Sequence, residues 1–179
     1  MSKLCTRLLF ISLLIISSNS FADKIEDTGT ALQIIIPAVT LGSTLTYEKN
    51  TGHDGTRQFA KSLATTLITT AALKEITHKK RPNGSNYKSF PSGHTSAAFM
   101  GAAFIHKRYG FKKAILPYIG ATYVAYSRVH AKKHDTTDVV AGAAVGILSS
   151  RYFTTPYKKL SVSPVVENGG LGVQLTKRW

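Results

Sequence analysis

The chain has 179 residues, 43% of them hydrophobic and 18% charged, so it is long enough for one domain with its own core and gives no sign of a second. Its 23 basic and 9 acidic residues give a formal net charge of +14, which favours anionic partners. The single cysteine, Cys5, excludes an internal disulfide and any metal site built from several cysteines.

Residues 1–22 are predicted to form a signal peptide that is removed. Lys3 and Arg7 precede a short apolar run, and small side chains before the end of the segment suit cleavage after Ala22. An uncleaved membrane anchor is the alternative, which the shortness of the apolar run disfavours. Cleavage removes the cysteine and leaves residues 23–179 as one exported catalytic domain with 21 basic and 9 acidic residues, a net charge of +12.

Helical patterns dominate the rest of the chain. Residues 28–47 carry no charge and include Pro37, which predicts a buried or membrane-contacting helix kinked or initiated at the proline. Apolar stretches at residues 160–166 and 171–176, on either side of a glycine turn, predict two strands. The expected fold is therefore all-α, a compact bundle of about five helices with a short C-terminal β-hairpin. The other four helices are predicted over residues 58–77, 92–109, 112–129 and 136–153.

Only residues 28–47 reach the roughly 20 residues that a bilayer-spanning helix needs. The mean hydropathy of the chain, −0.02, is also low for a protein with many spans. We therefore expect a soluble or peripheral bundle, in which small residues at 95–103 and 141–146 allow close helix packing. The uncharged runs in the later helices have 12, 14 and 12 residues, at 62–73, 114–127 and 139–150.

Three separated clusters between residues 74 and 138 together predict a site for a phosphate-like anion. They read Lys74-x6-Arg81-Pro82, Pro91-Ser92-Gly93-His94 and Ser127-Arg128-x5-His134-x3-Asp138. A tetrahedral oxyanion needs several fixed positive donors, which Lys74, Arg81 and Arg128 supply, and backbone N–H groups complete the cradle. Two histidines remain for chemistry.

His134 and Asp138 are four residues apart at the predicted start of the last helix. They therefore share a face, and the carboxylate can accept a hydrogen bond from the imidazole. That contact fixes the tautomer and leaves the other ring nitrogen free to attack. A second interpretation adds His130 and predicts a metal-binding face, which the neighbouring Lys132 and Lys133 disfavour because they repel a divalent cation.

The Pro91-Ser92-Gly93-His94 cluster lies where a loop becomes a helix. The N–H groups of a first helical turn have no intrahelical acceptor and carry positive partial charge, which favours a bound anion. Ser92 is predicted to cap the helix and to donate its hydroxyl to the anion, and Gly93 lets the anion approach bare backbone.

These three motifs, in this order, resemble the type 2 phosphatidic acid phosphatase and vanadium haloperoxidase superfamily over residues 58–150. The resemblance implies that His134 attacks phosphorus and forms a phosphohistidine, and that Asp138 orients His134. It also implies that His94 protonates the leaving oxygen and then activates the water that hydrolyses the intermediate.

The same resemblance assigns the cations. It selects Lys74 and Arg81 over the adjacent Lys79 and Lys80, which alone would be read as a solvated helix end. It implies neither a metal nor a cofactor. The implied phosphate-binding residues are Lys74, Arg81, Ser92, Gly93 and Arg128.

By this resemblance the chain is expected to be a metal-independent phosphatase. The expected substrates are phosphomonoesters or pyrophosphates of lipids, such as phosphatidic acid, phosphatidylglycerophosphate or undecaprenyl diphosphate. A secreted acid phosphatase acting on soluble phosphoesters is the first alternative, followed by a vanadium haloperoxidase and by a non-catalytic anion-binding protein.

Location and partners follow from the leader and the charge. An exported basic protein meets anionic headgroups, so we expect a periplasmic or cell-envelope protein that is peripheral to a membrane or anchored in it. Nucleic acid is the rival partner, which export and the lack of a recognised binding motif disfavour. No obligate protein partner is expected.

Overall fold

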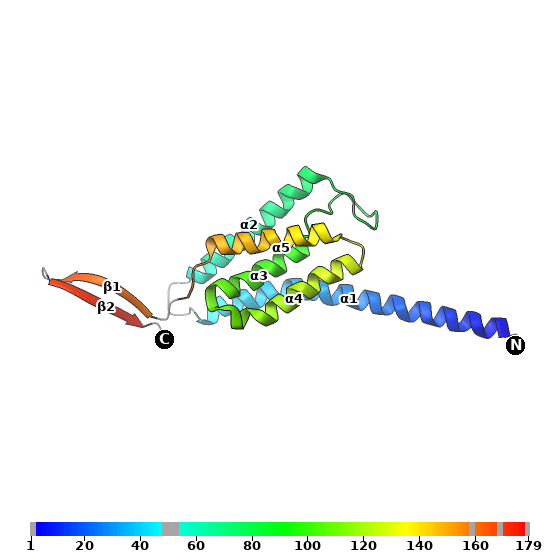
Figure 1. Ribbon diagram of the computed structural model, residues 1–179, viewed down its shortest axis with the longest axis horizontal. Coiled ribbons are helices and arrows are strands. Elements are labelled where there is room, and N and C mark those ends of the chain that lie inside the picture. Colours follow the sequence, from blue (N-terminus) through cyan, green and yellow to red (C-terminus); the bar gives the residue numbers. More distant parts are fainter. Residues whose placement is uncertain (1–2, 48–53, 158–159, 168–169, 178–179) are drawn as a thin grey trace.

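The computed structural model describes residues 3–47, 54–157, 160–167 and 170–177 (Figure 1). Within these residues the chain forms five helices and two strands, and the predicted helical bundle is confirmed. The helices are α1 (Lys3–Tyr47), α2 (Asp54–Thr77), α3 (Gly93–Tyr109), α4 (Phe111–His130) and α5 (Thr136–Phe153).

Helix α1 is longer than the sequence pattern predicted. It runs through Ala22 without interruption and keeps Pro37 inside it. One segment of it, Asp23–Thr46, has the length and mean hydropathy, 1.3, to cross a membrane, and it is the one such segment found among the described residues. Cleavage after Ala22 remains a prediction.

Helix α3 is the centre of the bundle and packs against the other four helices. Its contact with α5 is close because α5 presents glycines to it. A Cβ at Gly142 would lie 2.5 Å from the Ser92 carbonyl oxygen, and one at Gly146 would lie 2.2 Å from that of Ser96. The predicted close packing through small residues is therefore present, and it fixes the start of α5 against the start of α3.

Two small apolar clusters fill the bundle on either side of α3. One joins Ile36 of α1 to Ala98, Ala102, Ala121 and Val124. The other joins α2 to α3 through Phe59, Met100 and Phe104, and the two phenyl rings meet edge to face at 5.5 Å between centroids, a favourable aromatic geometry.

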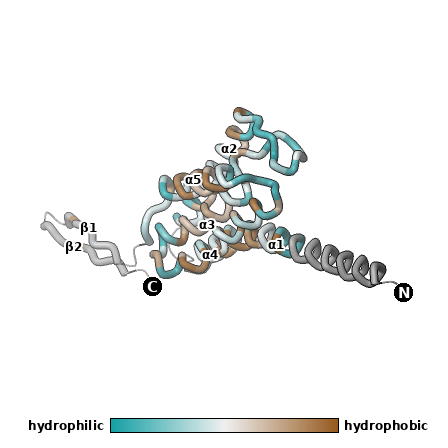
Figure 2. The backbone as a smooth tube through the Cα atoms, turned by 45° about the vertical axis from the view of Figure 1, so that its right-hand side comes forward, coloured by the Kyte–Doolittle hydropathy of each residue, from teal (hydrophilic) through white to brown (hydrophobic). Residues whose placement is uncertain are grey.

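Many large apolar side chains lie on the outside of the bundle rather than in it. Figure 2 shows hydrophobic segments along the outer helices. Exposed apolar side chains on four helices are typical of a surface that lipid or another chain covers, which the predicted soluble bundle would not need. The strongly exposed examples are Ile34 and Val39 of α1, Ile68 and Ile76 of α2, Leu116 and Ile119 of α4, and Val140, Leu148 and Tyr152 of α5.

The C-terminal residues form strands β1 (Leu160–Glu167) and β2 (Gly170–Lys177), which pair antiparallel from Leu160 opposite Lys177 to Glu167 opposite Gly170. The turn of the expected hairpin, residues 168–169, lies outside the described residues, so the hairpin as a whole remains an expectation. No described contact joins either strand to a helix. The strand pair is therefore no part of the bundle that carries the motifs.

The ends of four helices gather at one end of the bundle, the right-hand end in Figure 1. These are the C-terminal ends of α2 and α4 and the N-terminal ends of α3 and α5. The three sequence clusters all belong to these helix ends or to the loops beside them.

Candidate active site

The start of α3 has the predicted cap. Ser92 is the N-cap residue, and its hydroxyl oxygen accepts hydrogen bonds from the backbone N–H of Thr95 at 3.5 Å and from the Thr95 hydroxyl at 3.0 Å. The Ser92 N–H donates to the Asp138 carbonyl oxygen at 2.9 Å, which ties this turn to α5. A Cβ at Gly93 would meet only a Thr70 methyl group at 3.7 Å, so packing does not require glycine there and access to an anion remains its predicted role.

His94, the second residue of α3, is partly buried beside several cations. Burial, together with the charges of Arg128, His134 and Arg81, lowers its pKa to about 4. The imidazole is therefore neutral near pH 7 in the empty site. A bound phosphate would oppose these cations and favour the protonated imidazole, which is the form that a general acid needs.

His134 lies just before α5, not in its first turn, because Asp135 is the N-cap residue of that helix. Its side chain is 3% exposed, and its Nδ1 is 3.6 Å from Asp138 Oδ2. Burial, then Lys74 and Arg81, lower the pKa of His134 to about 4. With a neutral imidazole the 3.6 Å contact is a long approach rather than an ion pair, and Nδ1 has no hydrogen-bond partner among the described residues.

The Asp138 carboxylate is fully buried and held from several directions. Its Oδ1 accepts a hydrogen bond from Lys79 Nζ at 2.8 Å, and its Oδ2 accepts from the Ser89 hydroxyl and from the Asp135 N–H at 3.2 Å. Lys79 also pairs with the Asp135 carboxylate and holds the pKa of that carboxyl well below its usual range. We call Lys79, Ser89, His134 and Asp138 the His134 edge of the site.

The sequence assigned Lys79 no role in the site, because the family resemblance selected Lys74 and Arg81 as the phosphate ligands. Lys79 lies beyond the end of α2, and no partner was predicted for it. The signal was the pair of acids, Asp135 and Asp138, in the first turn of α5. Two carboxylates so close together, one of them buried, need a cation beside them.

Lys74 is near the end of α2 and binds the loop that leads into α3. Its Nζ donates to the carbonyl oxygens of Lys88 at 2.8 Å and of Pro91 at 2.6 Å. Burial and the nearby Arg81 lower its pKa to about 8. Lys74 therefore both anchors the Ser92 turn and contributes positive charge next to His134.

Arg81 reaches the site from a loop. Helix α2 ends at Thr77, the predicted limit, and His78 then takes a φ of 46°, in the left-handed region. The Arg81 backbone is then held by Asn86, whose carbonyl oxygen accepts from the Arg81 N–H at 2.9 Å. Its Nε is buried without a hydrogen-bond partner among the described residues, and a buried donor ordinarily has one.

Arg128 is 2% exposed near the end of α4. Its Nη2 donates to the Glu26 carbonyl oxygen at 2.7 Å, and its Nη1 is 3.8 Å from the Glu26 carboxylate, which also pairs with Lys133. Gly29 makes this approach possible, since a Cβ there would lie 1.9 Å from the Ser127 hydroxyl. We call Glu26, Arg128 and Lys133 the Arg128 edge of the site.

Sequence reasoning also missed Glu26. It lies just before the uncharged segment at 28–47, and 102 residues separate it from Arg128. No local pattern connects the two. The contact exists because α1 crosses the end of α4.

The predicted alternative of a metal face is not assembled. In the part of the chain that the structure describes, no three His, Cys, Asp or Glu side chains are grouped as metal ligands would be. His130 is exposed and lies against the Tyr126 ring at 5.6 Å between centroids. His134 and Asp138 are instead surrounded by Lys74, Lys79 and Arg81.

The site thus combines three convergent cations, two neutral histidines and a buried carboxylate at the start of a helix. The profile of the PAP2 superfamily matches residues 55–160, which contain all three motifs. This chain belongs to the PAP2 superfamily.

Individual relatives agree with the family. The PAP2 chain is 36% identical over 107 residues to a lipid A 1-phosphatase of Helicobacter pylori, a match that covers 54% of this chain and 55% of the relative. The chain thus spans about half the length of that curated relative.

Two solved structures share its fold. The crystal structure of Aquifex aeolicus LpxE superposes with a TM-score of 0.59 at 20% identity, covering 72% of this chain and 84% of that one. A transmembrane PAP2-type phosphatidylglycerolphosphate phosphatase from Bacillus subtilis gives a TM-score of 0.54 at 23% identity, covering 86% and 94%. Both support the helical arrangement of the PAP2 chain.

Proposed function

We propose that this chain is a metal-independent lipid phosphate phosphatase that works through a phosphohistidine at His134. The observation that carries the proposal is the position of Lys74, Arg81 and Arg128 around the two histidines, where the buried Arg81 Nε has no acceptor among the described residues. Each of these cations gains a partner when a phosphate group occupies the site, and charge-assisted hydrogen bonds of this kind are strong.

In the first step a ring nitrogen of His134 attacks phosphorus. The bond from phosphorus to the ester oxygen breaks as the new nitrogen–phosphorus bond forms, and the leaving oxygen takes a proton from His94. Asp138 lies on the Nδ1 side of His134, so the nitrogen that faces away from it is the nucleophile. A small movement that closes the 3.6 Å gap would stabilise the cationic ring of the intermediate.

In the second step His94 takes a proton from water, and the resulting hydroxide attacks phosphorus. The nitrogen–phosphorus bond breaks, inorganic phosphate leaves, and His134 returns to its neutral form. The cations and the first-turn N–H groups of α3 stabilise negative charge on the phosphoryl oxygens in both steps. Positioning and electrostatics supply the catalysis without a metal.

A lipid phosphate is the preferred substrate class for two reasons. The relatives include phosphatases named for lipid A and for lipid phosphates, and α1 and the outer helices expose apolar surface beside the site. The candidates are phosphatidic acid, phosphatidylglycerophosphate, undecaprenyl diphosphate and lipid A 1-phosphate. A soluble phosphoester is the alternative within the same chemistry. We place the protein in the cell envelope after export, in line with the signal peptide predicted at residues 1–22.

The test combines phosphate release with trapping of the intermediate. Purified protein in detergent should release phosphate from phosphatidic acid with EDTA present, and vanadate should inhibit it. Quenching in alkaline detergent with labelled substrate should trap an acid-labile, base-stable phosphoprotein in the parent and in His78→Ala, and none in His134→Ala, whose activity should fall about 10⁴-fold or more. An adduct that persists in His134→Ala, or activity that EDTA abolishes and zinc restores, would overturn the mechanism.

A further inference from the structure

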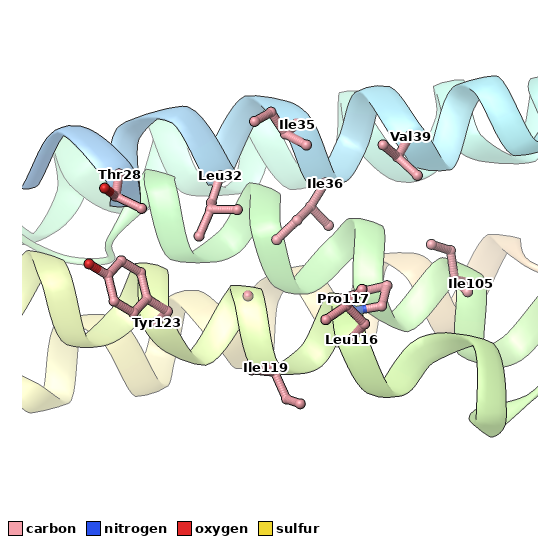
Figure 3. A pocket seen from close by; sticks show the side chains of 11 residues that line it. Thr28, Leu32, Ile35, Ile36, Val39, Ile105, Leu116, Pro117, Ile119 and Tyr123 are labelled. Carbon is pink, nitrogen blue, oxygen red and sulfur yellow. The ribbon is translucent and has the colours of Figure 1, made fainter. Parts of the chain in front are cut away.

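An apolar groove runs between α1 and α4, with α3 beneath it (Figure 3). Its volume is about 460 Å³, within the range of roughly 300 to 1,000 Å³ that small-molecule sites occupy. Its floor includes Ile36, which is buried, and its rim includes Val39, Leu116 and Ile119, which are more than half exposed. The groove is therefore open along its side and closed at its base.

The two ends of the groove differ in polarity. Figure 3 shows the hydroxyl groups of Thr28 and Tyr123 at one end, and aliphatic side chains of α1, α3 and α4 toward the other. The polar end adjoins the candidate active site. Thr28 is next to Gly29, whose Cα packs on Ser127. Thr28 is also two residues from Glu26, whose carbonyl oxygen accepts a hydrogen bond from Arg128. Along the groove, the anion site is followed by a polar rim and then by an apolar wall. The phosphate, polar and hydrocarbon parts of a lipid phosphate follow one another in the same order.

The dimensions of the groove suit one hydrocarbon chain better than a whole helix. From Thr28 to Val39 the α1 wall is eleven residues long, roughly 16 Å at the rise of an α-helix. A volume of about 460 Å³ over that length gives a mean cross-section of roughly 30 Å². A helix about 10 Å in diameter has more than twice that cross-section, so it would not lie wholly inside the groove, whereas an extended hydrocarbon chain would.

We propose that this groove binds one acyl chain of the lipid phosphate substrate while its phosphate group occupies the cage at His134. The proposal rests on the proposed phosphatase function and adds the place where the enzyme selects a lipid over a soluble ester. Binding along the groove buries hydrocarbon on one side of the substrate, which favours a lipid because removing apolar surface from water is favourable. The groove then contributes to the lipid's kcat/KM and nothing to that of a soluble phosphoester.

Gly120 allows the groove to be filled. It lines the groove, and a Cβ there would lie 3.1 Å from the flexible end of Ile36. Gly42 of α1 offers a matched control, because nothing lies within 4 Å of a Cβ at that position. Gly120→Leu should lower the ratio of kcat/KM for long-chain phosphatidic acid to that for p-nitrophenyl phosphate about tenfold, since displacing roughly two methylenes has that effect. Gly42→Leu should leave the ratio unchanged.

A second pair of variants covers the possibility that Gly120→Leu misfolds. Leu116 on the groove rim and Leu148 on α5 are 76% and 67% exposed, so an aspartate at either is compatible with folding. In a His134→Ala background, which cannot turn the probe over, Leu116→Asp should weaken binding of a fluorescent long-chain alkyl phosphate, measured by anisotropy, about tenfold relative to Leu148→Asp. Binding is measured without turnover and so does not depend on the phosphatase activity.

The outcomes separate the two proposals. Selective loss of lipid hydrolysis and alkyl phosphate binding in the groove variants supports the groove assignment. Equal behaviour of Leu116→Asp and Leu148→Asp in binding, or of Gly120→Leu and Gly42→Leu in the activity ratio, overturns it. If the parent hydrolyses no phosphoester but the groove variants still lose alkyl phosphate binding, the proposed function fails and the groove assignment stands.

Discussion

The two edges of the active site are held in different ways. At the His134 edge, Lys79, Ser89 and the Asp135 N–H satisfy the Asp138 carboxylate, and all three come from loops or helix starts next to the motifs. At the Arg128 edge, the carboxylate comes from Glu26 on α1, which is more than 100 residues away in sequence. The first edge is built by the bundle core itself, whereas the second depends on how α1 docks onto it.

Because their surroundings differ, we expect the two edges to have different roles. A buried, fully bonded carboxylate is suited to holding one side chain in one orientation, which the nucleophile needs. A carboxylate paired with two cations at a helix crossing competes with any anion that those cations bind. We therefore expect changes at the His134 edge to affect turnover and changes at the Arg128 edge to affect anion affinity.

The largest effect is expected for Asp138→Asn. The amide keeps the size of the side chain but loses the charge that orients His134 and stabilises its cationic form, so kcat for phosphatidic acid should fall roughly 10²- to 10⁴-fold. Asp54→Asn, at the opposite end of α2 from Lys74, controls for the change in net charge. A loss smaller than about tenfold in Asp138→Asn would contradict the assigned role.

The next prediction concerns how the stability of the folded protein depends on pH. Burial and neighbouring cations lower the pKa of both His94 and His134 to about 4, from 6.5. Between these values the unfolded chain binds more protons than the folded one. The stability that the two neutral histidines contribute is therefore fully present above about pH 6.5 and is lost as the pH falls toward 4. The loss is on the order of 3 kcal/mol for His134.

This pH dependence can be measured as the melting temperature of parent and variants between pH 7 and pH 5. The parent should melt several degrees lower at pH 5, and inorganic phosphate should reduce the difference because it favours protonated histidines. His134→Asn should have a shallower pH dependence than the parent, and His78→Asn, at an exposed position, should not. Identical slopes in all three proteins would show that His134 is not buried as described.

A smaller effect is expected for Lys79→Met, which leaves the buried Asp138 carboxylate without its cation. We expect a decrease in kcat of about tenfold with KM nearly unchanged, because Lys79 acts through Asp138 and does not touch the phosphate. Lys79→Arg should restore most of the activity, and Lys80→Met, the adjacent exposed lysine, is the control. An increase in KM at constant kcat would instead identify Lys79 as a phosphate ligand.

The smallest effect is expected for Glu26→Gln, at the other edge. Glutamine keeps the backbone contact with Arg128 and removes the charge that competes with phosphate for Arg128 and Lys133. Product phosphate should then inhibit at a roughly threefold lower concentration, with less change in kcat. Weaker inhibition by phosphate in Glu26→Gln than in Asp54→Asn would show that the Glu26 carboxylate supports the anion site and does not compete with it.

Helix ends were the most predictable part of the fold, because their signals are local. Ser92 and Gly110 bound α3 as expected, and the predicted fifth helix has the observed limits. A cap depends on one side chain and the next few amides. Helix α2 also ends at Thr77 as predicted, whereas the left-handed backbone at His78 is a conformation that residue type alone does not specify.

The sequence by itself predicted the residues of the candidate site. Three motifs with fixed internal spacing specify the histidines, the carboxylate and the cations, since each motif holds its residues on one turn or loop. The tertiary structure alone decided which groups complete them. Lys79 on Asp138, Glu26 on Arg128 and the groove between α1 and α4 all depend on where helices cross. Crossings are set by packing of small residues such as Gly29, Gly142 and Gly146 across the whole bundle, and no local pattern encodes that geometry.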